Sequence, residues 1–467
     1  MYRPLVLAGR PVERPPIAIA APFDGRSLDE VAQANAADLD AACAHAASLA
    51  PEVGRWPAHR RAEVLRAVAQ GLAARAEEIA GLICHEGGKP ITLARAEVGR
   101  AIDTFNLCAE ETTRIEGELL PLDHTALGAG RVGLVRRFSR GPVAAICPFN
   151  FPLNLVAHKV GPAIAAGCPV VVKPAEQTPS AALVLGEIVV NAGWTAISVV
   201  PCDRTVAALL VDDPRLPVIS FTGSDRVGWA MRARAPRKQV VLELGGNAAV
   251  IVDRGADLAK AAPRIATGAY AHAGQVCISV QRVLAHHDVA DELRDRLVDE
   301  LGRVPCGDPA EARVVVGPMI DRFHADRVES WVREAAEGGA TVHGGGREGS
   351  VLRPSLVENA RPSDRVTADE VFGPTATLAR FDDWHEAIAA VNSGRYGLQC
   401  GVFTRDIGKL WLAFEGLEVG GVIHDDFPTF RVDAMPYGGV KDSGVGREGP
   451  RWAIRDFTEE RLLVLRP

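Results

Sequence analysis

The 467-residue chain is long enough for two or three domains with large buried cores. Its net charge of −7 lacks the basic surplus of a nucleic-acid-binding protein, so we expect no nucleic-acid partner. No apolar run is long enough to span a membrane, no secretory signal opens the sequence, and the nine cysteines form no CxxC pair. We therefore expect a cytoplasmic protein with free thiols, no membrane partner and no metal site.

The first third of the sequence is predicted to be helical. Apolar residues recur three and four positions apart over 37–80 and 89–116, which is typical of amphipathic helices. The alanine-rich stretch 34–50 is interpreted as a helix rather than as low-complexity sequence, because alanine has the highest helix propensity. Alternating, β-branched residues over 131–149 then predict strands.

Short apolar strands and helices alternate from there to residue 246. The predicted strands are 169–174, 195–201, 217–224 and 238–246, and the predicted helices between them are 180–193, 206–212 and 227–235. This order implies right-handed crossovers and a mostly parallel sheet with both faces covered. A second series has candidate strands at 248–254, 281–287 and 375–381. The final strand, 461–467, needs a sheet to join, in this chain or in another subunit.

Three residues are candidates for catalysis. Cys277 lies in GQVCI, and although a free cysteine is usually a small buried apolar residue, it becomes a nucleophile when a base and an oxyanion donor are near. Glu243 ends an apolar strand before a glycine pair, and its alternative is a capping or ion-paired glutamate. Asn150 lies in PFNFP, where it could donate to an oxyanion or simply form the turn.

Two segments could bind a nucleotide. In SFTGSDRVG (220–228) a strand leads through a turn into a helix, whose free N–H groups could hold a pyrophosphate, although the segment matches neither GxGxxG nor a P-loop. Lys173 and Glu176 follow another strand, and a carboxylate there could accept hydrogen bonds from ribose hydroxyls while repelling a 2′-phosphate. This favours NAD over NADP. The alternative is a solvated charged loop.

Seven motifs in collinear order make the chain resemble the aldehyde dehydrogenase superfamily. They are PFNFP (148–152), KPAEQTP (173–179), FTGS (221–224), ELGG (243–246), GQVC (274–277), EVFGP (370–374) and PYGGVKDSGVGRE (436–448). The resemblance implies that Cys277 is the nucleophile, that Glu243 activates the deacylating water, and that Asn150 and the backbone N–H of Cys277 stabilise the oxyanion. Glu448 would be an outer link in proton transfer.

The resemblance also implies cofactor contacts and an architecture. The cofactor, NAD by preference with NADP as the alternative, would contact Ile146, Pro148, Lys173, Glu176, Gly223, Ser224, Leu244, Glu370 and Phe372. The fold would be α/β, with a Rossmann-like cofactor domain (1–117 and 140–245), a catalytic domain (246–450) and a small β oligomerisation arm (118–139 and 451–467). Such an arm predicts a homodimer or homotetramer.

The stretch FPTFRVDAMPYGG (427–439) is similar to a branch that includes lactaldehyde and phosphonoacetaldehyde dehydrogenases, whose substrates are small and polar or anionic. His158 and Arg431 would then bind the substrate tail, with Phe151 as a further candidate. Alternatively, His158 is only a pocket-wall residue and Arg431 pairs with Asp433 or Asp426. Asp425 replaces an asparagine that is usual in the family, which puts a carboxylate where a neutral amide is expected and changes the local electrostatics.

Rival functions follow from the same residues. The chain could be a broad-specificity aldehyde dehydrogenase, a nicotinamide-dependent reductase without covalent catalysis, or a catalytically silent scaffold. The presence of Cys277, Glu243 and Asn150 together argues against a scaffold. Relatives that transfer the acyl group to coenzyme A usually lack the glutamate, so Glu243 favours hydrolysis to the acid.

Overall fold

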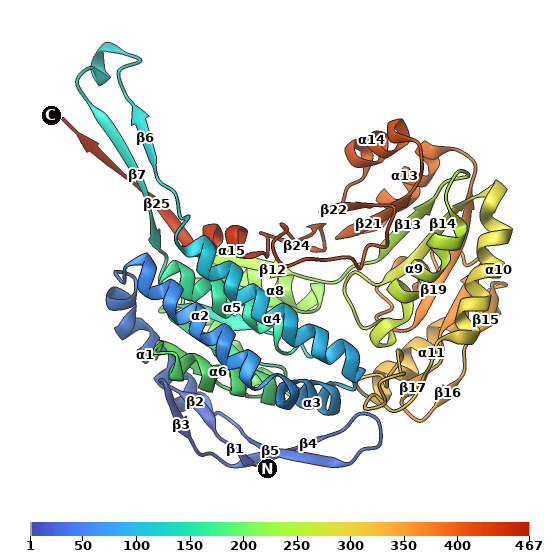
Figure 1. Ribbon diagram of the computed structural model, residues 1–467, viewed down its shortest axis with the longest axis horizontal. Helices are drawn as coiled ribbons and strands as arrows, with labels where there is room; N and C mark the ends of the chain where they lie inside the picture. The colour runs from blue at the N-terminus through green and yellow to red at the C-terminus, as the bar shows by residue number, and fades with distance from the viewer. Residues whose placement is uncertain (1, 467) are drawn as a thin grey trace.

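The computed structural model describes residues 2–466 and confirms the predicted α/β class. Two bodies, each built on a twisted sheet with helices on its faces, lie side by side, and a β-ribbon projects from one of them (Figure 1). Within the described residues, no helix is both long and apolar enough to cross a membrane. All nine cysteines are free.

The first body contains an eight-stranded sheet. Its five central strands, β12 to β10, are mutually parallel, while β24, β2 and β3 are antiparallel to their neighbours. In spatial order the strands are β24 (Gly444–Val445), β12 (Gln239–Glu243), β11 (Val218–Thr222), β8 (Val143–Ile146), β9 (Val170–Lys173), β10 (Ile197–Val199), β2 (Leu5–Leu7) and β3 (Arg10–Val12).

Helices cover both faces of this sheet. Because side chains alternate along a strand, Val170 and Val172 of β9 pack into one core and Val171 packs into the other. The helices are α1 (Ala36–Val53), α2 (Ala58–Ala74), α3 (Ala76–Gly87), α4 (Ile91–Thr112), α5 (Asn154–Ala166), α6 (Ser180–Asn191), α7 (Arg204–Asp212), α8 (Asp225–Arg234) and α15 (Pro450–Phe457). α15 packs against α5 and α4.

The second body contains a seven-stranded sheet, parallel except at the β15–β18 pair. Its strands are β15 (Thr341–Gly344), β18 (Ser355–Glu358), β19 (Thr375–Phe381), β14 (Val280–His286), β13 (Ala248–Val252), β21 (Gln399–Phe403) and β22 (Gly421–His424). Its helices are α9 (Leu258–Tyr270), η2 (Ala271–Gly274), α10 (His287–Arg303), α11 (Arg322–Glu337), α12 (Arg365–Ala368), α13 (Trp384–Asn392) and α14 (Ile407–Gly416).

The projecting ribbon, called the arm below, consists of three antiparallel strands. They are β6 (Glu118–Pro121), β7 (Val132–Ser139) and β25 (Thr458–Leu465), with the short helix η1 (Ala126–Gly128) before β7. The remaining strands form three small sheets, made of β1 (Tyr2–Arg3), β5 (Ser27–Ala32) and β4 (Pro16–Ala20), of β16 (Arg347–Glu348) and β17 (Val351–Leu352), and of β20 (Tyr396–Gly397) and β23 (Val440–Lys441).

The elements predicted from periodicity are confirmed. The helical stretch 37–80 is divided into α1, α2 and the start of α3 because Gly54 ends α1, Pro57 caps α2 and the chain bends at Arg75. The predicted final strand forms β25, which pairs with β7 of the same chain. Its last residue, Pro467, lies outside the described residues.

Candidate active site

The three candidate catalytic residues come from distant parts of the chain. Glu243 is the last residue of β12, and Asn150 follows β8, two strands away in the same sheet. Cys277 lies between η2 and β14 of the other body. Because the carboxyl ends of parallel strands form one edge, this arrangement brings Glu243 and Asn150 to the edge that faces the Cys277 loop.

A hydrogen bond ties Asn150 to that loop. Its amide Nδ2 donates to the carbonyl oxygen of Gln275 at 3.0 Å. Gln275 is itself anchored, because its Oε1 accepts from the N–H of Ile320 at 2.9 Å and its Nε2 donates to the carbonyl of Pro318 at 3.3 Å. Nδ2 of Asn150 carries a second hydrogen, which can donate to a developing oxyanion.

The sulfur of Cys277 contacts a phenol. Its Sγ lies 2.9 Å from the hydroxyl oxygen of Tyr437. Burial raises the pKa of the Cys277 thiol to about 12, while the hydrogen bond to Tyr437 and the charge of Arg431 act to lower it. Within residues 2–466, the backbone N–H of Cys277 has no acceptor, so it can serve as a second oxyanion donor.

The carboxyl group of Glu243 is buried and unpaired. Neither of its oxygens has a hydrogen-bond partner among the described residues. Burial, followed by the nearby charge of Glu448, raises its pKa well above the ordinary value. Position 438 requires glycine, since a Cβ there would lie 2.7 Å from the backbone carbonyl oxygen of Gly446 and 2.8 Å from Oε1 of Glu243. A carboxyl group without a structural partner and with a raised pKa is suited to act as a base near neutral pH.

A buried ionic network lies behind Glu243. Glu448 accepts hydrogen bonds from Nζ of Lys159 at 3.1 Å and from the Arg431 guanidinium at 3.0 Å, and Lys159 also donates to Thr222 at 2.6 Å. Burial alone would raise the pKa of Glu448, but the charges of Lys159 and Arg431 outweigh it and lower that pKa to about 2. Glu448 is therefore ionised and holds both cations.

His158 and Asp433 extend this network. Nε2 of His158 lies 2.7 Å from Asp433, which also receives two hydrogen bonds from Arg100 and one from Asn154. Burial raises the pKa of Asp433, but its bonds to His158 and Arg100 outweigh burial and hold the pKa well below its usual range. Burial and the charge of Arg431 lower the pKa of His158, which favours the neutral imidazole.

The structure places Arg431 against Glu448 at 3.0 Å, and its Nε lies 3.9 Å from Asp433. Asp426, the other partner considered from the sequence, instead pairs with Arg264. The guanidinium of Arg431 stacks on the ring of Tyr437, with its central carbon 3.8 Å from the ring centroid. It therefore joins the ionic network to the phenol that contacts Cys277.

The ring of Phe151 packs beneath a buried cation. Nζ of Lys89 lies 3.5 Å from the ring centroid, and Lys89 pairs with Glu97. Glu97 in turn caps the first turn of α5, because it accepts hydrogen bonds from the N–H groups of Leu153 and Asn154.

Asp425, which replaces the asparagine usual in the family, pairs with Lys260 on the surface, where its side chain is 40% exposed. The negative charge of Asp425 is thus compensated by Lys260.

The residues predicted to bind the cofactor gather along one edge. They follow or end neighbouring parallel strands, namely β8 for Ile146 and Pro148, β9 for Lys173 and Glu176, β11 for Gly223 and Ser224, and β12 for Leu244. Ser224 is exposed and precedes α8 without a capping side-chain bond, so its hydroxyl is open to an anion, whereas the N–H of Arg226 in the first turn of α8 already donates to the carboxylate of Asp225 at 2.7 Å. Nζ of Lys173 lies 3.7 Å from Glu176. These donors and acceptors fit a dinucleotide.

Glu370 and Phe372 reach this edge from the other body. Oε1 of Glu370 accepts from the N–H of Gly246 at 3.0 Å, and a Cβ at Gly245 would lie 2.4 Å from the same carboxylate. Burial raises the pKa of Glu370 to about 7. The Phe372 ring meets Phe149 edge-on, with centroids 5.9 Å apart. The predicted cofactor residues therefore come from both bodies and lie where the two bodies contact each other.

Sequence reasoning missed the contribution of Tyr437, Lys159 and Gln275. Tyr437 is part of the motif PYGG and Gln275 is part of the motif GQVC. Lys159 lies outside the motifs but follows the candidate residue His158 on α5. The motifs indicated which segments form the site, but they could not indicate which side chain contacts the sulfur of Cys277, because that depends on how the two bodies pack against each other.

The comparisons with known proteins agree with this geometry. Residues 10–463 match the model of the aldehyde dehydrogenase family. The chain is 43% identical over 411 residues to 3-sulfolactaldehyde dehydrogenase of Priestia aryabhattai, covering 87% of this chain and 86% of the relative. It is also 42% identical, with a TM-score of 0.98, to aldehyde dehydrogenase 21 of Physcomitrella patens in complex with the reaction product succinate, covering 100% of this chain and 98% of the other.

A third similar protein is NADP-dependent glyceraldehyde-3-phosphate dehydrogenase of Bacillus halodurans complexed with NADP, which is 34% identical with a TM-score of 0.96 and coverage of 100% and 99%. The resemblance inferred from the motifs is thus confirmed, both for the family and for the branch that acts on lactaldehyde-like substrates. The chain belongs to the aldehyde dehydrogenase family.

Proposed function

We propose that this NAD(P)-dependent aldehyde dehydrogenase oxidises a small anionic aldehyde to the acid, with Cys277 as nucleophile, Asn150 as oxyanion donor and Glu243 as base. The observation that carries the proposal is the arrangement of these three residues where the two bodies meet, with Asn150 bonded to the loop of Cys277 and Glu243 close enough for its charge to act on the thiol. A thiol, an unpaired carboxyl group and an amide tied to the thiol's loop supply the groups that covalent aldehyde oxidation needs.

The residues act in a defined order. The thiolate of Cys277 attacks the aldehyde carbon, and Nδ2 of Asn150 and the N–H of Cys277 donate to the oxyanion of the adduct. When bound, the nicotinamide supplies a hydride acceptor, and the oxidised adduct is a thioester of Cys277. Glu243 then removes a proton from a water molecule, which attacks the thioester and releases the acid and the thiolate.

The charge around the substrate pocket supports an anionic substrate. Arg100, Arg431 and Lys159 pair with two carboxylates, Asp433 and Glu448, so this network holds three cations against two anions. Nε of Arg431 is buried without a hydrogen-bond partner among the described residues. We propose that Arg431, whose Nη2 lies 3.1 Å from Nε2 of His158, faces the anionic tail together with His158, and that Phe151 is a further contact. The relatives named for sulfolactaldehyde and for a succinate complex have such substrates or products.

We propose NAD as the preferred cofactor, bound by the nine residues predicted from the motifs. The carboxylate of Glu176, whose side chain is 36% exposed beside Lys173, would accept from a ribose 2′-hydroxyl and repel a 2′-phosphate. Initial rates with NAD and with NADP over a range of concentrations decide this. Glu176→Gln should reduce the ratio of kcat/KM with NAD to kcat/KM with NADP.

We also propose that the arm joins copies of this chain into a homodimer or homotetramer. β25 is an edge strand, and its residues Leu462, Leu463, Val464 and Leu465 are 42–57% exposed. β22 is an edge strand of the seven-stranded sheet, and the neighbouring α14 exposes Ile407, Trp411 and Phe414. An arm from a second copy that pairs with β22 would cover both surfaces. We further propose the division into a cofactor domain (1–117 and 140–245), a catalytic domain (246–450) and the arm (118–139 and 451–467); the separate sheets of the two bodies and the arm support it, although β24 pairs with β12 in the first sheet. Nine free cysteines support a reducing compartment such as the cytoplasm.

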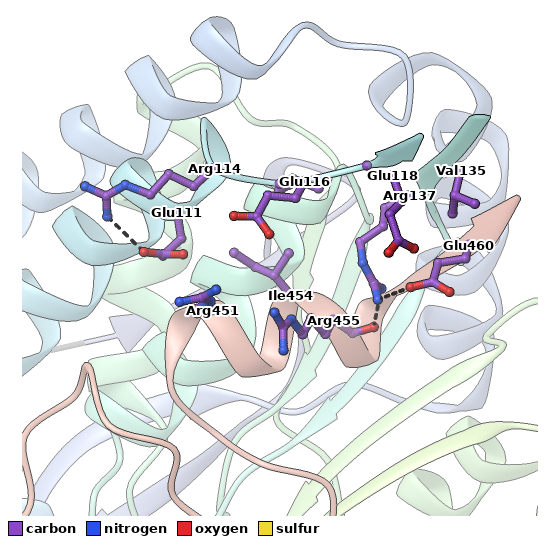
Figure 2. Close-up of a pocket in the computed structure, with 12 residues that line it drawn as sticks. Glu111, Arg114, Glu116, Glu118, Val135, Arg137, Arg451, Ile454, Arg455 and Glu460 are labelled. Carbon is purple, nitrogen blue, oxygen red and sulfur yellow. Dashed lines mark hydrogen bonds and ion pairs between the residues drawn. The ribbon is translucent and has the colours of Figure 1, made fainter. Parts of the chain in front are cut away.

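A cavity of about 370 Å³ opens where the arm meets α4 and α15, but it is a poor candidate for the substrate site. Its wall mixes arginines and glutamates that pair with one another, such as Arg114 with Glu111 and Arg137 with Glu460 (Figure 2). Paired charges leave no net attraction for an anion, and none of the predicted site residues lines this cavity.

The test is absorbance at 340 nm with a panel of aldehydes that share a short chain and carry a sulfonate, a carboxylate or no charge. We expect the anionic members to have the higher kcat/KM and iodoacetamide to abolish the signal. Arg431→Lys, which keeps the charge but loses the planar guanidinium, should raise KM for the anionic members more than for the neutral one. Equal kcat/KM values across the panel would contradict the anionic-substrate assignment.

A further inference from the structure

The position of Tyr437 relative to the sulfur of Cys277 is fixed by packing. The tyrosine is 2% exposed and packs with Ile278 and Leu398 in a small apolar cluster that includes Cys277 at its edge. Its hydroxyl oxygen lies 2.9 Å from Sγ. Within residues 2–466, this hydroxyl is the one hydrogen-bond partner of Sγ.

The hydroxyl can act as donor toward an ionised sulfur. Burial raises the pKa of Tyr437 well above its ordinary value, so the phenol keeps its proton when the thiol loses one. A thiolate accepts hydrogen bonds and cannot donate one. Deprotonation of Cys277 therefore leaves an O–H group aimed at a negative sulfur, and hydrogen bonds to an ion are stronger than those between neutral groups.

The charges around Cys277 make this donor important. The carboxyl groups of Glu370 and Glu243 oppose ionisation of the thiol, as does burial, while Arg431 favours it. Arg431 does not touch the sulfur but covers the ring of Tyr437 at 3.8 Å, and Glu448 holds it there. A cation over the ring draws electron density from the phenol and strengthens its hydroxyl as a donor.

We infer that Tyr437 is a positioning residue that stabilises the Cys277 thiolate through its hydroxyl, with Arg431 stacked on its ring to strengthen that hydrogen bond. The inference rests on the proposed role of Cys277 as nucleophile. It assigns to the network of Glu448 and Arg431 a purpose beyond charge balance, because the network ends at the donor that contacts the sulfur.

The test is the pH dependence of alkylation of Cys277 by iodoacetamide in the free enzyme, followed by mass spectrometry of its peptide, in wild type and Tyr437→Phe. Loss of the donor moves the midpoint to higher pH. A tenfold smaller thiolate fraction is partly offset by the greater nucleophilicity of a more basic thiolate, so we expect alkylation about threefold slower near neutral pH. A purely structural role of the ring would leave the midpoint unchanged, because phenylalanine keeps the ring.

Tyr270→Phe is the matched control, since it removes a buried hydroxyl that donates to the carbonyl of Ser355 at 3.4 Å and does not contact Cys277. We expect its profile to equal that of wild type, and Arg431→Lys to give a midpoint between wild type and Tyr437→Phe. A midpoint for Tyr437→Phe at or below that of wild type overturns the inference. If Cys277→Ala retains turnover, the nucleophile assignment fails instead, so the two failures are distinguishable.

Discussion

In the active site, charged side chains are buried, whereas in the arm, large apolar side chains are exposed. Glu243, Glu448 and Lys159 are each at most 3% exposed, while Leu462 and Leu463 of β25 are more than half exposed. Both regions reverse the usual distribution, in which charges face water and leucines are buried. The reversal costs folding free energy in both places, so each region has a function other than stabilising the fold of a single chain.

The two reversals differ in how they are compensated. In the site, Glu448 and Asp433 pair with cations of the same chain, whereas the buried carboxyl group of Glu243 has neither a cation nor a hydrogen-bond donor among the described residues. In the arm, the free edge of β25 has no partner within residues 2–466. Substitutions in the site should therefore change chemistry, and substitutions in the arm should change association.

The largest effect is expected for Cys277→Ala. Removal of the sulfur removes the covalent intermediate, so turnover should be lost while the cofactor still binds. Absorbance at 340 nm measures turnover, and quenching of tryptophan fluorescence by added cofactor measures cofactor binding. Activity near that of wild type would mean that the site works without covalent catalysis.

Glu243→Gln should separate the two half-reactions. Without the base, steady turnover should fall about 10²–10⁴-fold, while a first-turnover burst of reduced cofactor persists in stopped-flow records. Loss of the burst would contradict the assignment of Glu243 to deacylation.

The same variant tests the stability cost of burying Glu243. Since the folded state raises the pKa of Glu243, the folded chain holds its proton where the unfolded chain has released it, and stability falls as pH rises above the unfolded pKa of about 4.3. Glu243→Gln removes this cost, so its free energy of unfolding in urea should exceed that of wild type by more at pH 8 than at pH 5. A lower stability at both pH values would show that the carboxylate is paired after all.

Asp433→Asn should affect folding more than the chemical step. It leaves the partly exposed Arg100 against a neutral amide, and loss of hydrogen bonds to a charged group costs about 1.5–3 kcal/mol of unfolding free energy. The folded state depresses the pKa of Asp433, so its contribution is present above about pH 4 and is lost as pH falls through the folded pKa. Urea titrations of both proteins at neutral pH and near pH 2 measure this, and the difference in the free energy of unfolding should be smaller near pH 2.

The smallest effect on the single chain is expected for Leu463→Glu in the arm. A surface substitution changes subunit stability within about 0.5 kcal/mol, but a buried charge at a subunit interface weakens association. Sedimentation velocity should show smaller species for this variant. Leu209→Glu, at an exposed position of α7 outside the arm, is the matched control and should sediment as wild type. If both variants sediment identically, the proposal that β25 forms part of the subunit interface is wrong.

Local sequence determined the elements and the identity of the reactive groups. Val170, Val171 and Val172 are apolar without interruption, which predicts a strand covered on both faces, and the predicted strand forms β9 between two cores. The position of Glu243 at the end of a strand and of Asn150 in the turn after another could also be predicted, because polar residues at the carboxyl ends of parallel strands meet at one edge. The motifs then indicated the family without any structure.

Only the tertiary structure decided which charges pair and which group touches the sulfur. The sequence suggested Asp433 or Asp426 as the partner of Arg431. The guanidinium does lie 3.9 Å from Asp433, but its shorter contact is with Glu448 at 3.0 Å, because the chain after Tyr437 folds back beside Lys159. Nothing local in PYGG distinguishes the Tyr437 hydroxyl from that of any buried tyrosine. Its role follows from the meeting of two bodies, since a hydrogen bond depends on the distance between atoms, whereas periodicity and propensity are properties of neighbouring residues in the chain.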